Sequence, residues 1–122
     1  MSLVPGAVAF GSVQCWDLLA IDAPDGTRSP TVLHSSDDSR AVLIALSPGQ
    51  SLGDHQVKEH AWIVVLDGEV VVEASGHVEQ GGRGMLVRLE PDEQHSVRSD
   101  GGARLLLVLA PWPGEGHYRG DL

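Results

Sequence analysis

Histidines are the residues of this chain best suited to chemistry, and six are present. Two segments hold the informative ones. Residues 48–62 contain His55 and His60 with Glu59 beside them, and residues 84–97 contain His95. An imidazole can act as a general base, hydrogen-bond a ligand or coordinate a metal ion. We therefore expect the chemistry of the protein to lie in these two segments.

Several other chemistries are excluded by the sequence. The glycine-rich run 81–84 is not a phosphate loop, because no Gly-Lys-Ser/Thr follows it. No Gly-x-Ser-x-Gly elbow occurs, which argues against an α/β-hydrolase. The single cysteine, Cys15, excludes both an internal disulfide and a cysteine-rich zinc site.

Composition limits the partners and the compartment. The 122 residues are typical of one domain, and the formal charge is −9 at pH 7 with no run of Lys or Arg. Phosphate binding draws on clustered cations, so we expect neither nucleic acid nor an anionic membrane as a partner. The lone cysteine and the absence of a recognisable signal peptide favour a cytoplasmic location.

The elements that must position the histidines read as strands. Short apolar runs alternate with Gly, Pro and Asp turn signals, and no run shows a sustained helical period. The predicted strands cover residues 14–20, 31–34, 40–46, 61–66, 69–74, 85–89, 94–98 and 103–110. Asp67-Gly68 between two β-rich runs predicts a hairpin. We expect a single all-β domain over 1–122, with a barrel core at about 14–110 and an extended arm over 111–122.

The two histidine segments resemble the two motifs of the cupin superfamily. The first motif runs Gly, five residues, His-x-His, three or four residues, Glu, six residues, Gly, and Gly49, His55 and Gly68 fit it. The second runs Gly, five residues, Pro-x-Gly, two residues, His, three residues, Asn, and Gly84 and His95 fit it. The resemblance covers residues 40–110 and implies a double-stranded β-helix, the cupin jelly-roll barrel, with a histidine-lined pocket and a homodimeric state.

The chain also departs from both motifs. The position of the second histidine is Val57, and that of the glutamate is Ala61 or, with the longer gap, Trp62. The Pro, Gly and Asn positions of the second motif hold Glu90, Asp92 and Ser99. The resemblance therefore carries over two of the four usual metal ligands, His55 and His95.

A third metal ligand would have to come from Glu59 or His60. Strand alternation favours Glu59, because residues 55, 57, 59 and 61 share one face of a regular strand. Ligand chemistry favours His60, which would point inward if a β-bulge broke the alternation. Imidazole and carboxylate donors suit a divalent ion such as Fe, Mn, Ni or Zn.

Three functions follow as alternatives. The first is a non-catalytic protein that binds a small organic ligand in the pocket, with or without a metal. The second is a metal-dependent enzyme of the dioxygenase or isomerase type, with His55 and His95 plus Glu59 or His60 as ligands. The third is a metal-free enzyme in which His55 or His95 is the general base and Glu59 its partner.

Overall fold

The computed structural model describes residues 7–10, 13–23, 26–52 and 57–113. Ten strands occupy these residues, and they form one two-stranded hairpin and one eight-stranded sheet. In chain order the strands are β1 Ala7–Phe10, β2 Val13–Trp16, β3 Gly26–Ser35, β4 Arg40–Leu46, β5 Gln50–Ser51, β6 His60–Ala74, β7 His77–Gly82, β8 Leu86–Leu89, β9 His95–Ser99 and β10 Ala103–Ala110. The predicted all-β, jelly-roll fold is confirmed.

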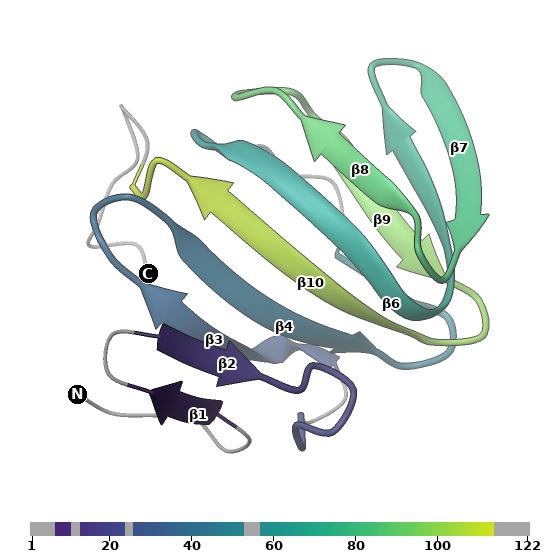
Figure 1. Cartoon of the computed structure of the whole chain (residues 1–122). Coiled ribbons are helices and arrows are strands. Elements are labelled where there is room, and N and C mark those ends of the chain that lie inside the picture. The colour runs from purple at the N-terminus through teal and green to yellow at the C-terminus, as the bar shows by residue number, and fades with distance from the viewer. Residues whose placement is uncertain (1–6, 11–12, 24–25, 53–56, 114–122) are drawn as a thin grey trace.

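Strand β6 organises the large sheet because two sets of neighbours share it. The main path of the sheet is β3-β4-β10-β6-β9-β5, and β7 and β8 also pair with β6. The first half of β6 pairs with β10 and β8, and its second half pairs with β9 and β7. All of these pairings are antiparallel, and Figure 1 shows the sheet curling so that β7, β8 and β9 are grouped at one edge.

The hairpin predicted at Asp67-Gly68 is wrong, because β6 continues through both residues. The register against β10 shifts there: Arg104 pairs with Asp67, and Leu105 pairs with Val65. This β-bulge bends the strand from one set of neighbours to the other. Gly68 has φ +83°, and a Cβ at this residue would lie 2.1 Å from the Gly102 carbonyl oxygen. The glycine therefore serves a close backbone approach at a bend.

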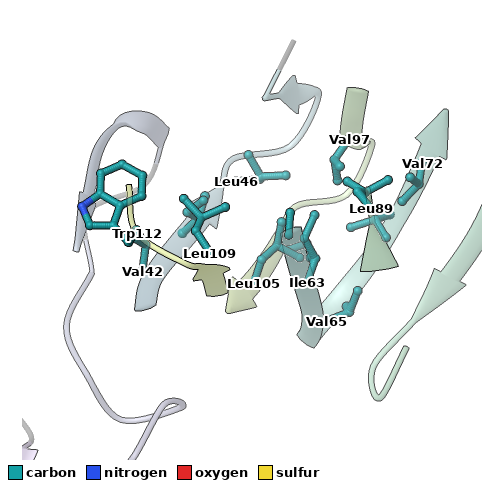
Figure 2. Close-up of a cluster of buried hydrophobic side chains, with 14 residues drawn as sticks. Val42, Leu46, Ile63, Val65, Val72, Leu89, Val97, Leu105, Leu109 and Trp112 are labelled. Carbon is teal, nitrogen blue, oxygen red and sulfur yellow. The ribbon is translucent and has the colours of Figure 1, made fainter. Parts of the chain in front are cut away.

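Alternation along β4, β6 and β10 builds the barrel core. Leu105 and Ile63 are almost completely buried and lie at its centre, as Figure 2 shows. Trp112, just after β10, packs beside Val42 and Leu109 and closes one end of the same cluster. The guanidinium of Arg40 lies 4.7 Å from the Trp112 ring centroid. Apart from Trp112, the buried residues of this cluster are aliphatic, in keeping with the 4% aromatic content of the chain.

The segment after β2 covers part of the outer face of the sheet. The strand predicted over residues 14–20 is shorter in the structure: β2 ends at Trp16 and a turn follows, with the Ile21 N–H bonded to the Asp17 carbonyl at 3.2 Å. The turn places Ile21 against Leu33 and Leu43 in a second, smaller buried cluster. The predicted arm beyond residue 113 lies outside the described residues. No helix long and apolar enough to cross a membrane occurs in the described chain.

Candidate site at the end of the barrel

Glu59, directly before β6, points into the barrel. Its side chain is 0% exposed, and it shares its face with Ala61 and Ile63, which are both 1% exposed. The alternation is regular here, because β6 pairs residue by residue with β10 from His60 to Val65. A bulge would have turned His60 inward, but the break in register lies farther along the strand, between Val65 and Asp67. A carboxyl group is thus buried next to the apolar residues that begin β6.

The same alternation places His60 on the outer face. Its Nδ1 atom lies 3.4 Å from a carboxylate oxygen of Glu90 and 3.2 Å from the Arg88 guanidinium. The His60 side chain is 40% exposed, and Trp62 lies beside it under Arg88, 5.2 Å from ring centroid to guanidinium carbon. Of the two candidates for a third ligand, Glu59 therefore faces the barrel interior and His60 faces a surface ion-pair cluster.

His95 begins β9 and is almost fully buried, with 3% of its surface exposed. Its Nδ1 atom lies 3.0 Å from the Glu93 carbonyl oxygen, which can only accept a hydrogen bond. Nδ1 must therefore carry a proton, and in the neutral ring the lone pair lies on Nε2. A backbone carbonyl that fixes the tautomer in this way is also typical of histidines that coordinate metals.

Glu59 and His95 lie at the same end of the barrel. The Asp92 N–H donates to the Val57 carbonyl at 2.8 Å, and the Lys58 ammonium lies 2.6 Å from the Asp92 carboxylate. These contacts join the residues before Glu59 to the turn that precedes His95. His95 also pairs with Ala74 at the far end of β6. Figure 1 shows that the bent strand β6 runs down the molecule and back up, so that its two ends point to the same end of the barrel.

His55 lies outside the described residues, so the structure does not place it. The flanking chain is placed: the Leu52 N–H donates to the Val97 carbonyl at 2.8 Å, and Val57 is held by Asp92. Within the described ranges, no group of three or more His, Cys, Asp or Glu side chains could hold a metal ion. The described part of the site therefore offers His95 and Glu59 as its two inward polar groups of this kind.

Comparison with known proteins identifies the fold family. The family model of the cupin domain matches residues 42–110, more than half of the chain. This chain is a member of the cupin family. No functionally curated protein matches its sequence.

Three solved structures illustrate the similarity. A conserved protein of unknown function from Streptococcus pyogenes is 18% identical, with a TM-score of 0.70 over 90% of this chain and 95% of that one. A cupin superfamily protein from Desulfitobacterium hafniense is 16% identical, with a TM-score of 0.70 over 77% and 86% of the two chains. A Thermus thermophilus protein is 29% identical, with a TM-score of 0.62 over 68% and 82%. The two less identical neighbours show the fold alone.

The departures of this cupin from the family motifs now have positions in the barrel. Ala61, at the motif position of the glutamate, points inward and is buried. Glu59 lies two residues before Ala61 on the same face. A carboxylate is therefore present one side-chain repeat of the strand before the position of the motif glutamate. Ser99, at the motif position of the asparagine, is buried, and its hydroxyl donates to the Glu69 carbonyl at 2.5 Å. That serine holds β9 to the far part of β6.

Sequence reasoning missed a cavity of about 330 Å³ between β7 and β8. Its apolar lining comes mainly from alternate residues of β6 and β8, including Val72, Ala74 and Val87. His77 and Glu79 of β7 and Glu93 complete the lining. The signal that could have found it is the inward set of apolar residues on β8, a strand that pairs within the described sheet with β6 alone.

Glu93 is the one carboxylate among the described lining residues whose pKa is clearly shifted. The Ser75 hydroxyl donates to its Oε2 at 2.7 Å, and the Glu90 N–H donates to its Oε1 at 3.2 Å. These two hydrogen bonds, the Ser75 bond first, hold the pKa of Glu93 below its ordinary value of 4.5. The nearby His95 and His77 lower this pKa further, to a smaller extent. Glu93 is therefore a carboxylate at neutral pH, and its backbone carbonyl anchors His95.

Proposed function

We propose that this cupin binds a small organic ligand at the end of the barrel where His95 and Glu59 are buried. The observation that carries the proposal is the buried His95 ring, whose Nδ1–H is committed to the Glu93 carbonyl. That bond orients Nε2 as a hydrogen-bond acceptor. Glu59 adds a fully buried carboxylate at the same end of an apolar barrel. A few oriented polar groups in an apolar pocket are the usual composition of a small-molecule site.

The proposal is tested by screening small organic acids, amines and sugars for thermal stabilisation of the purified protein. A ligand at one hundred times its Kd stabilises the folded state by about 2.7 kcal/mol. For a domain of this size that raises the Tm by roughly 10 °C. We expect His95→Gln and Glu59→Gln to lose the shift. The matched control is His60→Gln, because the His60 imidazole lies on the outer face. A ligand whose shift survives both inward substitutions would refute the proposal.

A divalent metal in the same site is the second candidate. The carbonyl-bound Nδ1 of His95 and the inward Glu59 favour it, since both resemble the surroundings of metal ligands. The described residues, however, supply one nitrogen and one oxygen donor, whereas a catalytic centre uses three protein ligands. They do not make a complete metal site by themselves. In this proposal His55 would supply the third donor.

Metal analysis of protein purified without chelator separates the two candidates. Stoichiometric Fe, Mn, Ni or Zn that is lost in His55→Ala and in His95→Ala would support a metal centre, and retention in His60→Ala would place it inside the barrel. Substoichiometric metal that does not change in His95→Ala would exclude it. Dioxygenase or isomerase activity is to be sought only if stoichiometric metal is found, because those activities depend on it in this proposal.

The homodimer is also proposed, and the cytoplasmic location stays a prediction. Apolar side chains at the outer face of β6 and β8 support a dimer: Trp62 is 38% exposed and Leu86 is 59% exposed. Light scattering coupled to size-exclusion chromatography measures the mass directly. A monomer at micromolar concentration would exclude a stable dimer.

A further inference from the structure

The cavity between β7 and β8 lies beside the site at the end of the barrel, since Glu93 lines the cavity and its carbonyl accepts a hydrogen bond from His95. Neither His95 nor Glu59 lines it. Its floor is apolar and belongs to the barrel interior, formed by Val72, Ala74, Met85, Val87 and Leu89. Its volume of about 330 Å³ is within the range of small-molecule pockets. At about 30 Å³ per water-sized group, it holds a ligand of roughly ten non-hydrogen atoms.

The charges at its rim are mainly negative. Glu79 and Glu93 both line the cavity, and neither forms an ion pair with another residue that the structure describes. Glu93 is held by two neutral donors, the Ser75 hydroxyl and the Glu90 N–H, so its negative charge is not cancelled by a cation. His77 adds an imidazole that can donate or accept a hydrogen bond.

Arg88 is the one Lys or Arg side chain among the described lining residues, and its charge is used elsewhere. The guanidinium donates to the Glu90 carboxylate and lies over the Trp62 ring. It also contacts Nδ1 of His60, on the outer face of the sheet. The cavity side of β8 is therefore left with apolar side chains, and the two carboxylates set the charge at the rim.

From this combination we propose that the cavity binds an organic cation with a short apolar body, such as an arylalkyl ammonium ion. The apolar body would lie against Val72, Val87 and Leu89, and the ammonium group would lie at the rim between Glu79 and Glu93. Apolar contact provides most of the affinity, and the carboxylates provide the preference for positive charge. The overall charge of −9 acts in the same direction by attracting cations to the surface.

The test uses three probes of nearly equal size: 2-phenylethylammonium, 2-phenylethanol and phenylacetate. Binding to the full chain is followed by amide chemical shifts in an NMR titration. We expect the ammonium ion to bind most tightly and phenylacetate least, with shift changes concentrated on β7 and β8. Added salt should weaken binding of the ammonium ion and leave that of the alcohol unchanged, because rim charges are exposed to solvent.

Variants assign the binding to the cavity. Each of Glu79→Gln and Glu93→Gln should weaken binding of the ammonium ion by up to about fivefold, the range of exposed ion pairs, and leave that of the alcohol unchanged. Glu69→Gln, a glutamate outside the cavity, is the matched control. Val87→Phe should fill the cavity and abolish binding of both probes, whereas Val13→Phe, on the exposed part of β2, should not.

Three results would overturn this inference. They are equal or tighter binding of phenylacetate, no binding of the ammonium ion at millimolar concentration, and binding that survives in a folded Val87→Phe variant. His95→Gln separates the inference from the proposed function. Amine binding that persists in this variant supports a distinct site, whereas its loss together with shift changes at the barrel end would assign the amine to the His95 site instead.

Discussion

Replacing Gly68 with alanine tests whether the bend of β6 is set by a close backbone approach. A Cβ at this residue would lie 2.1 Å from the Gly102 carbonyl oxygen and 2.8 Å from the Ala103 Cα. Both neighbours are backbone atoms, so neither can rotate away. The φ of +83° is also unfavourable for a residue with a Cβ. The substitution therefore combines a conformational cost with a steric one.

The two costs can be estimated separately. The left-handed conformation costs an alanine about 1–2 kcal/mol, partly offset by the lower entropy of its unfolded chain. Forcing extra volume into a packed region costs typically about 1–3 kcal/mol. We therefore expect Gly68→Ala to lower the free energy of unfolding by about 3 kcal/mol, the sum of these two costs. The conformational cost alone is measured by Gly76→Ala, since Gly76 has φ +81° and a Cβ added there would meet no other described atom within 4 Å.

Urea denaturation followed by circular dichroism measures both variants under the same conditions. Gly76→Ala should cost about 1 kcal/mol, so the difference between the two variants isolates the contact with Gly102. A Gly68→Ala variant no less stable than Gly76→Ala would refute the steric account of the bend. The result matters for the site, because this bend brings both ends of β6 to the end of the barrel that holds Glu59 and His95.

Further predictions concern a titrating carboxylate and a half-buried cation. Ser75→Ala should raise the pKa of Glu93, as measured by NMR titration of its carboxyl carbon, because it removes the largest cause of the lowered pKa. The pKa of Glu93 is lower in the folded protein than in the unfolded chain. Ionised Glu93 therefore stabilises the protein above its unfolded pKa, and this contribution is lost as the pH falls through the folded pKa. An unchanged Glu93 pKa in Ser75→Ala would contradict the assignment of the lowered pKa to the Ser75 hydrogen bond. Arg104→Ala should cost about 2 kcal/mol, because Arg104 donates to the Leu18 and Ile21 carbonyls at 2.8 Å. Amide exchange should then accelerate in residues 13–23, and unchanged protection there would show that these bonds do not hold the segment.

The local sequence pattern was sufficient to predict the ranges of the strands whose two faces are both apolar. The predicted ranges 40–46 and 103–110 coincide with β4 and β10, because a long Val, Leu and Ile run bounded by turn residues has few alternatives. It was insufficient at Asp67-Gly68. That dipeptide is compatible with a hairpin and with a bulge, since both use a residue with positive φ. The pairing with β10 decides between the hairpin and the bulge, because β10 pairs with β6 on both sides of the bulge.

The two histidine segments, residues 48–62 and 84–97, show the same difference between what the sequence predicts and what the structure decides. The sequence by itself determined an acidic, all-β cupin domain and named Glu59 and His60 as the competing neighbours of the histidine pair. It could not choose between them, because the choice depends on where the alternation of β6 is broken. Only the tertiary structure located that break between Val65 and Asp67, after the segment that holds Glu59 and His60. Glu59 is therefore buried in the barrel, and His60 faces Glu90 and Arg88 on the outside. The cavity between β7 and β8 likewise exists only because the sheet curls, a property of the pairing partners and not of either strand alone.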